Sequence, residues 1–176
     1  MDDLNKANER LNKLTDKDVR IAYLPPATVG SIYSEAADSP AETGDLQAVL
    51  VVENNLQQVK PDFRHYGLNH YLDGKQAYER WITIPDDLTV KPPFEKKNFA
   101  GGMYAGYSIW FSDFIQAPYE AWKRLQAWAQ NHVEYEIAPE LPWFEEHLND
   151  MRYSIWPSQN AEQQLDLLIP IQRKSS

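Results

Sequence analysis

Apolar residues recur mainly in short runs with strand periodicity, and proline or glycine interrupts two of the longest runs. Val19–Tyr33 is broken by Pro25-Pro26, and Phe94–Phe111 is broken by Gly101-Gly102. Proline cannot donate to a strand ladder, and glycine inside a strand often marks a bulge or tight bend. The first run therefore predicts an edge strand or two strands joined by a kink. The second predicts a strand with one sharp interruption.

A hairpin and two further strands complete the predicted β pattern. Phe63–His70 and Tyr78–Ile84 are its arms, and Leu72–Lys75 contains the Asp-Gly pair of a hairpin turn. Later strands are expected over Trp143–Leu148 and Gln164–Ile171.

Three segments carry helical signals. Ser39-Pro40 resembles an N-cap followed by proline at the first helical position. The helix that it would begin runs to about Gln58, with apolar positions Leu46, Val49, Leu50, Val52 and Leu56. Pro118–Asn131 is amphipathic, because one arc of about 120° on a helical wheel holds Ala121, Trp122, Leu125, Trp128 and Ala129. Residues 2–15, with Leu4, Ala7, Leu11 and Leu14 at 3-4-3 spacing, predict a short amphipathic helix.

The order strand, helix, strand, strand occurs twice, which indicates an internal duplication. Val29-Gly30 matches Ala105-Gly106, and Ile82–Pro85 matches Leu167–Pro170. The offsets are 105 − 29 = 76 and 167 − 82 = 85 residues, so the two copies differ in loop length. The pattern predicts an α+β fold built from two related halves.

Composition narrows the class of protein. The chain is 43% hydrophobic and 24% charged, as in globular proteins, and its 6 Trp and 10 Tyr suit a ligand pocket, an interface or an aromatic core. A net charge of −9 argues against direct nucleic-acid binding. The absence of cysteine excludes disulfides and thiolate chemistry. Without a signal-like run or an 18-residue apolar stretch, we expect a cytoplasmic protein that does not associate with membranes.

Acidic residues beside aromatic residues are the candidates for chemistry. Glu79 lies between Tyr78 and Arg80, two positions before Trp81, and Glu145 lies two positions before His147. We interpret the two acids as occupying corresponding places of the duplicated fold. The run Phe99–Phe111 is interpreted as one wall of an aromatic pocket, to which it contributes Tyr104, Tyr107 and Trp110. Tyr104 and Tyr107 are expected on opposite faces of their strand.

Two kinds of chemistry fit such a pocket. A carboxylate among aromatic rings is costly unless it is paired, and a lipophilic cation would supply both a charge and a surface for stacking. The same geometry suits hydrolysis in which a glutamate with a raised pKa works with a tyrosine hydroxyl, the candidates being Glu145, Glu79 and Tyr104. The residues alone do not separate binding from catalysis. Without a nucleotide, serine-hydrolase or zinc motif, and with dispersed histidines, no cofactor or metal is predicted.

Five motifs in order resemble the GyrI-like small-molecule-binding domains. They are VRIAYLPPATVGSI, YERWITIP, NFAGGMYAGYSI with APYEAWKRLQAW, WFEEHLND and LDLLIPI, and they cover residues 18–172. Such domains are effector modules of AraC- and MerR-type transcription regulators or stand-alone proteins. The resemblance implies two tandem βαββ (SHS2-like) units in a pseudo-twofold antiparallel sheet, with helices packed on it and a ligand groove between the halves.

The resemblance also implies a site and a set of functions. The pocket glutamate of the family falls on Glu145, joined by Glu79, Trp81 and Tyr104, and His147 stands where the family often has tyrosine. Family members bind lipophilic cations, and some look like hydrolases of cyclopropane-containing compounds that use a Glu/Tyr pair. Others inhibit gyrase through protein contact. We expect an effector or drug binder, with the hydrolase and the interaction module as alternatives.

The resemblance divides the chain into three parts. Residues 1–17 would be a helical stub or linker, 18–172 a domain with halves at about 18–90 and 91–172, and 173–176 a tail. The stub is interpreted as a helix packed on the body, a dimerising segment or a linker from a DNA-binding domain, so a homodimer stays open.

Overall fold

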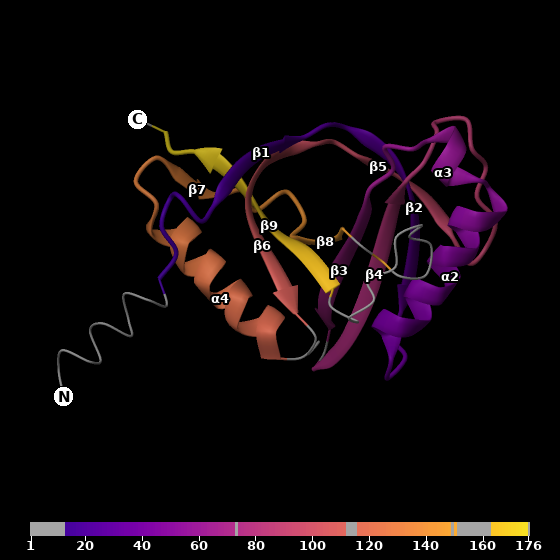
Figure 1. The fold of residues 1–176 in the computed structure, drawn as a ribbon, viewed down its shortest axis with the longest axis horizontal. Coiled ribbons are helices and arrows are strands. Elements are labelled where there is room, and N and C mark those ends of the chain that lie inside the picture. Colours follow the sequence, from indigo (N-terminus) through magenta and orange to yellow (C-terminus); the bar gives the residue numbers. More distant parts are fainter. Residues whose placement is uncertain (1–12, 73, 112–115, 149, 151–162, 176) are drawn as a thin grey trace.

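Figure 1 shows the computed structural model, which describes residues 13–72, 74–111, 116–148, 150 and 163–175. Nearly all of the predicted helix at 2–15 lies outside the described residues. The described residues form nine strands and three helices. They are β1 (Arg20–Leu24), β2 (Ala27–Ser34), α2 (Ser39–Glu53), α3 (Leu56–Val59), β3 (His65–Leu72), β4 (Lys75–Thr83), β5 (Glu95–Phe99), β6 (Gly102–Phe111), α4 (Gln116–Asn131), β7 (Tyr135–Ile137), β8 (Phe144–His147) and β9 (Gln163–Arg173).

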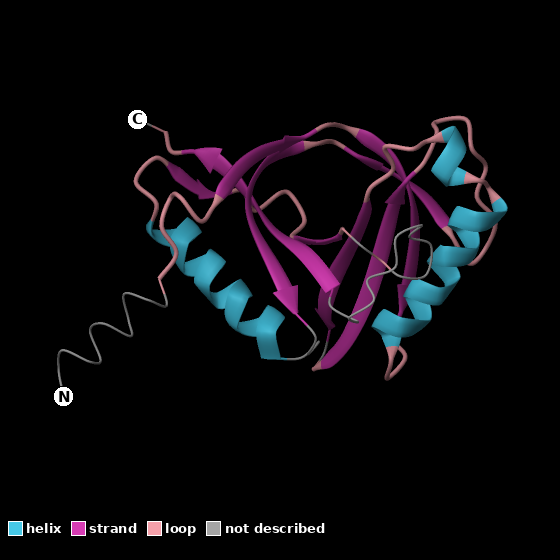
Figure 2. Ribbon diagram, in the orientation of Figure 1, coloured by secondary structure: helices cyan, strands magenta, loops and turns pink. Residues whose placement is uncertain are grey.

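One curled antiparallel sheet organises the molecule, in the strand order β1-β6-β9-β8-β3-β4-β2-β5, with β7 paired to β9 (Figure 2). Exchanging β1, β2, β3 and β4 for β5, β6, β8 and β9 and reversing the order gives the same sequence of strands. The two halves are therefore related by a pseudo-twofold operation, and the predicted duplication and α+β fold class are confirmed.

Each half lends its first strand to the other half. β1 pairs with β6, and β5 pairs with β2, in one continuous antiparallel register, so the links β1–β2 and β5–β6 lie side by side. Pro25-Pro26 and Gly101 lie in these adjoining links, so the two apolar runs are interrupted where their sequences predicted. Gly101 has φ +76°, and a Cβ there would lie 2.7 Å from both the Leu24 carbonyl oxygen and the Pro26 nitrogen.

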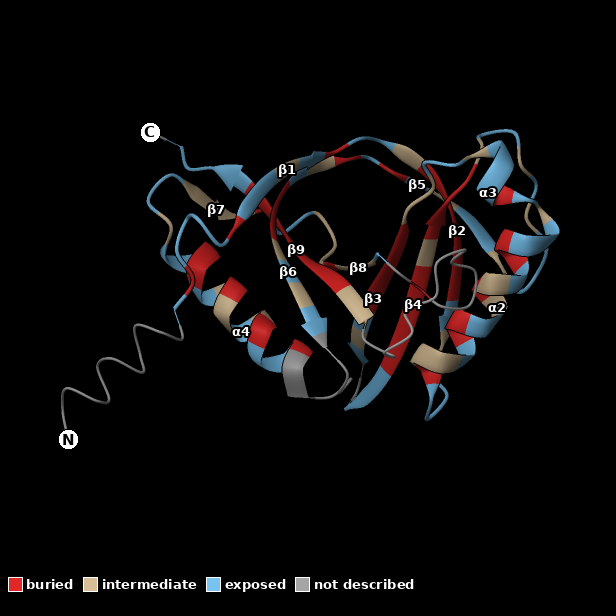
Figure 3. Ribbon diagram, in the orientation of Figure 1, coloured by how far each residue is buried: buried red, intermediate tan, exposed pale blue. Residues whose placement is uncertain are grey.

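Both long helices pack on one face of the sheet, which we call the helix face. α4 lies over β6 and β9, and α2 lies over β2 and β4, at opposite ends of the curl (Figure 1). Each helix turns buried residues toward the sheet and exposed residues outward (Figure 3). The other face, which we call the far face, carries a separate aromatic cluster of Tyr66, Trp81, Phe99, Tyr104 and Phe144 with aliphatic neighbours.

The prediction for α4 is confirmed, whereas that for α2 is wrong in its buried face. Ala121, Leu125, Trp128 and Ala129 are buried under α4, as its periodicity predicted. In α2, Val49 and Val52 are exposed, and the helix buries Thr43, Gly44 and Gln47 beside Leu50 and Val51. α2 also ends at Glu53, and a separate turn of helix follows in α3. Its N-cap is Asp38 rather than Ser39.

Candidate functional site

Glu145, at the centre of β8, is a carboxylate held by three neutral donors. Its oxygens accept hydrogen bonds from the Asn69 amide (3.0 Å), the Tyr78 hydroxyl (2.9 Å) and the Trp122 indole (3.0 Å). The three donors come from β3, β4 and α4, and so from both halves of the fold. Glu145 is only partly buried, whereas Tyr78 is 3% exposed. Among the described residues, the arrangement fixes the carboxylate in place without supplying a positive charge to it.

Gly67 makes the contact between Tyr78 and Glu145 possible. It pairs with Glu145 across β3 and β8, on the helix face. A Cβ at Gly67 would lie 1.8 Å from the Tyr78 hydroxyl oxygen and 3.1 Å from His147 Nε2. The phenol therefore occupies the space that any side chain at position 67 would fill.

His147 lies on the same face, at hydrogen-bond distance from the same phenol. Its Nε2 is 3.2 Å from the Tyr78 hydroxyl, and its ring stacks on His65 with centroids 4.5 Å apart. His65 in turn contacts a buried ionic cluster, in which Arg80 Nη1 is 2.6 Å from His65 Nε2 and Asp150 Oδ2 is 3.6 Å from His65 Nδ1. These contacts connect Glu145 to a buried polar network beneath the N-terminal part of α2.

Aromatic side chains flank the carboxylate on the α4 side. The rings of Trp122 and Trp143 stack with centroids 5.6 Å apart, and both are partly exposed. Tyr107 packs against the same cluster, with the Arg124 guanidinium 6.0 Å from its ring centre. Glu145 therefore lies beside flat apolar surface that a ligand could share.

Glu79 occupies a different environment, on the far face. Its carboxylate is bonded to Lys97 (2.7 Å), His70 (2.9 Å), Ser31 and the Trp81 indole. Burial opposes its ionisation, but the hydrogen bonds from Lys97, Ser31 and Trp81 outweigh burial and hold its pKa below the ordinary value. Glu79 thus has its countercharge within the protein.

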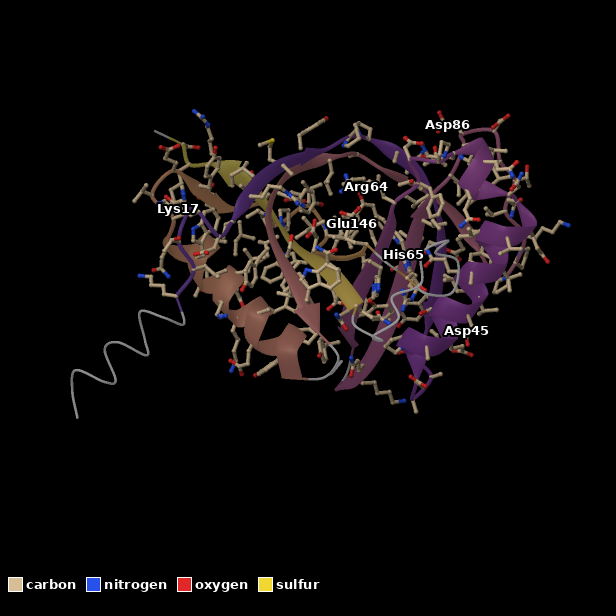
Figure 4. All side chains as sticks on the ribbon, viewed as in Figure 1. Lys17, Asp45, Arg64, His65, Asp86 and Glu146 are labelled. Carbon is tan, nitrogen blue, oxygen red and sulfur yellow. The ribbon has the colours of Figure 1, made fainter. Side chains whose placement is uncertain are left out.

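The far face also contains a cavity of about 390 Å³ at Glu79, lined by Ser31, Tyr33, Glu79, Pro93, Glu95 and Lys97. Although this is a measurable hollow, its walls are polar, and its buried carboxylate is already neutralised. We therefore place the candidate ligand site at Glu145, where no cationic side chain of the described residues is paired with the carboxylate and the surface is aromatic. Farther along this face, the Arg64 side chain reaches Glu146 with an Nε–Oε1 distance of 2.6 Å (Figure 4).

The predicted site residues do not meet in one pocket. Paired residues of neighbouring strands lie on the same face of the sheet, so the pairings show which face each predicted residue occupies. Gly67 pairs with both Glu145 and Arg80, whereas the adjacent Leu68 pairs with Glu79. Glu145, His147 and Tyr107 lie on the helix face, as the predicted two-residue spacing required. The far face holds Glu79, Trp81, Tyr104 and Trp110. We expected Tyr104, Trp81 and Glu79 to meet Glu145. This prediction is wrong, because Glu145 lies on the opposite face of the sheet from the other three.

Three further expectations change with the structure. Tyr104 is fully buried and donates to the Pro142 carbonyl, so the tyrosine at Glu145 is Tyr78. Trp110, expected in the wall of the pocket, is 60% exposed on the far face and does not lie beside Glu145. Glu79 is on β4 and Glu145 on β8, whereas the symmetry relates β8 to β3, so the two acids do not occupy corresponding places. Sequence reasoning missed Asn69, Gly67 and the role of Tyr78, and only the period-two spacing of Asn69 and Gly67 in β3 pointed to a shared face.

Comparison with known proteins identifies the family of this chain. A family model described as an integron-associated effector binding protein, Cass2, matches residues 20–171. The chain belongs to this family. Family membership agrees with the GyrI-like resemblance and makes the chain a small-molecule effector-binding protein. A comparison with curated protein sequences found no match.

Solved structures share the fold of this family member at low identity. The C-terminal domain of EcmrR aligns with a TM-score of 0.64 and 12% identity, over 89% of this chain and 98% of that one. A hydrolase from Listeria innocua aligns at 0.59 and 10%, over 95% and 98%. SAV2435 bound to tetraphenylphosphonium aligns at 0.51 and 15%, over 88% and 93%.

The described residues carry neither of two features that belong to other classes of protein. No helix among them has the length and apolar character needed to cross a membrane. Within the same part of the chain, no three His, Asp or Glu side chains are grouped so as to hold a metal ion.

Proposed function

We propose that this effector-binding protein takes lipophilic aromatic cations at Glu145, as a drug binder or as the sensor of a transcription regulator. The observation that carries the proposal is the charge state of the site. Within the part of the chain that the structure describes, Glu145 accepts from three donors that are all neutral, and it lies beside the partly exposed Trp122 indole. A cation there would meet an uncompensated carboxylate.

The surroundings of Glu145 suit the apolar part of such a ligand. Stacking on an indole face and cation–π contact contribute roughly 0.5–2 kcal/mol each, and the stacked Trp122 and Trp143 offer both. Tyr78 supports the same reading, because burial and then the neighbouring Glu145 charge raise the pKa of its phenol. The phenol stays protonated and keeps donating to the carboxylate. The tetraphenylphosphonium bound by SAV2435 is a ligand of this chemical class.

Titration with tetraphenylphosphonium tests the proposal directly. We expect quenching of tryptophan fluorescence with a dissociation constant in the micromolar range, and Glu145→Gln should weaken binding at least about tenfold, which corresponds to about 1.4 kcal/mol. Glu79→Gln is the matched control, because Glu79 already has Lys97 as a partner, and it should bind the cation normally. Equal binding by wild type and Glu145→Gln would reject the proposed site.

A second function is favoured by one contact, the 2.9 Å hydrogen bond between the Tyr78 hydroxyl and Glu145. Glu145 could activate water as a general base while Tyr78 acts as its proton-donating partner, in a hydrolase of strained, cyclopropane-containing compounds. The test is turnover of a cyclopropane-containing substrate followed by product analysis. Hydrolysis that survives both Glu145→Gln and Tyr78→Phe would exclude this pair as the catalyst.

A further inference from the structure

The Tyr78 hydroxyl has one proton and two acceptors on the helix face. It lies 2.9 Å from Glu145 Oε2 and 3.2 Å from His147 Nε2. A phenol donates one hydrogen bond and can also accept. A neutral His147 with its Nε2 unprotonated competes with Glu145 for that proton. A protonated His147 donates to the phenol oxygen instead, and the phenol proton then belongs to Glu145 alone.

The neighbouring imidazole, His65, is held in its neutral form. The Arg80 guanidinium is always protonated and lies 2.6 Å from His65 Nε2, so it donates to that nitrogen and occupies its lone pair. The remaining ring nitrogen, Nδ1, lies toward Asp150. Of the two stacked rings, His65 therefore has a guanidinium at its Nε2 among the described residues, whereas Nε2 of His147 lies beside a hydroxyl.

The charged groups around His147 come from several elements. Among the described residues, β3 contributes His65, β4 contributes Tyr78 and Arg80, β8 contributes Glu145, and Asp150, three residues after β8, contacts His65 and Arg80. β9 faces it with Leu165, its partner across the ladder. Arg80 opposes a charge on His147, whereas Glu145 and Asp150 favour one. Of the residues that the structure describes, His147 is the side chain in contact with the Tyr78 hydroxyl that is of a type titrating near neutral pH.

We propose that His147 sets the charge that the Glu145 site presents to a ligand, so that protonation of its imidazole weakens the binding of cations. With His147 neutral, the pair carries one negative charge. With His147 protonated, the pair is neutral, and the positive imidazolium lies one phenol oxygen away from the carboxylate. The inference rests on the cation site proposed above and adds its regulation by pH.

Tetraphenylphosphonium is a suitable probe because its charge does not depend on pH. In the wild-type protein, we expect its dissociation constant to rise at least about fivefold between pH 8.5 and pH 5.5. The uncharged triphenylphosphine oxide should show no such loss over the same range. This comparison uses the wild-type chain alone, so it does not depend on the folding of any variant.

His147→Gln identifies the residue responsible. Glutamine can accept from the phenol but cannot gain a proton, so this variant should bind tetraphenylphosphonium equally at both pH values. His70→Gln is the matched control, since His70 contacts Glu79 on the far face, and its pH dependence should equal that of the wild type.

The outcomes separate this inference from the proposed function. Binding at pH 8.5 that needs Glu145 but does not change at pH 5.5 overturns the inference and leaves the cation site standing. The inference is likewise overturned if the pH dependence persists in His147→Gln or extends to triphenylphosphine oxide. Absence of tetraphenylphosphonium binding at pH 8.5 overturns both.

Discussion

The position of the Tyr78 phenol depends on the absence of a side chain at Gly67. A methyl group there would meet the phenol oxygen at 1.8 Å and the ring carbon Cζ at 2.6 Å. Gly67→Ala should therefore push the phenol away from Glu145. Because overpacking of a filled space costs about 1–3 kcal/mol, we expect that loss in the free energy of unfolding and weaker cation binding. Urea unfolding and fluorescence titration measure the two effects.

A double-mutant cycle isolates this contact. In the Tyr78→Ala background the space opposite position 67 is vacated, so adding Gly67→Ala should cost little. The two substitutions should then be non-additive by at least about 1 kcal/mol. Additive losses would show that the strain at position 67 does not involve the Tyr78 ring.

Glu79 gives the far face a dependence on pH whose sign follows from its environment. Its pKa is lowered in the folded protein, because the bonds from Lys97, Ser31 and Trp81 outweigh burial. A lowered pKa contributes stability that is fully present above the ordinary value of 4.5 and is lost as the pH falls through the folded-state value. Acid should therefore weaken the bonds of Glu79 with Lys97, Ser31 and Trp81 by protonating the carboxylate.

Comparison of the wild type with Glu79→Gln measures that contribution. At neutral pH the variant should be less stable by about 1–3 kcal/mol, since Lys97 loses its charged partner. The difference should shrink as the pH is lowered from about 6 to about 3. Glu95→Gln is the control on the same cavity, because the Glu95 side chain is 76% exposed. A pH-independent difference for Glu79→Gln would contradict the assignment.

At the scale of elements, the two long helices differ in how far their sequence predicts their packing. α4 lies over the apolar residues of β6 and β9, so its wheel predicts its buried face. Under α2 lies Arg80, whose guanidinium donates to the Pro40 carbonyl and to the Thr43 hydroxyl. A buried charge requires polar partners, so α2 turns Thr43 inward and leaves Val49 and Val52 exposed. Hydrophobic periodicity contains no information about that buried charge.

Gln47 is the polar residue of α2 that this explanation does not cover. It is fully buried, and neither its amide nitrogen nor its amide oxygen has a hydrogen-bond partner among the described residues. An unsatisfied buried polar group costs about 1–3 kcal/mol. Gln47→Met keeps the length of the side chain and removes that cost, so we expect stabilisation by about 1 kcal/mol.

Thermal and urea unfolding test this expectation. Gln130→Met is the matched control, because Gln130 is an exposed glutamine of the other long helix, and glutamine and methionine have similar helix propensities. It should change stability very little. Destabilisation by Gln47→Met would mean that the amide serves a purpose that a thioether cannot replace.

At the scale of the whole molecule, the position of the site depends on register, which the sequence does not determine. Period-two spacing correctly separates Tyr104 from Tyr107 and Glu145 from Glu146. It does not say which strands become neighbours. Because Glu145 pairs with Gly67 and Glu79 with the adjacent Leu68, a difference of one position in β3 places the two acids on opposite faces. The motifs therefore predicted the fold but merged two separate environments into one pocket.

The two inter-strand links lie side by side where the halves join, and substitution of Gly101 tests whether their contact holds the halves in this register. Gly101 and Gly74 have nearly the same backbone angle, φ +76° and +77°, so alanine incurs a similar conformational penalty of roughly 1–2 kcal/mol at either position. They differ in surroundings. A Cβ at Gly74 meets nothing within 4 Å, whereas one at Gly101 meets the backbone of Leu24, Pro25 and Pro26 at 2.7–2.9 Å.

Gly74→Ala should therefore cost only the conformational penalty, and Gly101→Ala should cost at least about 2 kcal/mol more, because backbone atoms of the other link must move. Those atoms join β1 to β2, and displacing them disturbs the pairings β1–β6 and β2–β5 through which each half completes the other. Urea unfolding compares the two variants, and amide exchange should show faster exchange in β1 and β5 for Gly101→Ala alone. Equal losses of stability would mean that the links can separate without cost, and the register that divides Glu145 from Glu79 would then have to be maintained by the central strands.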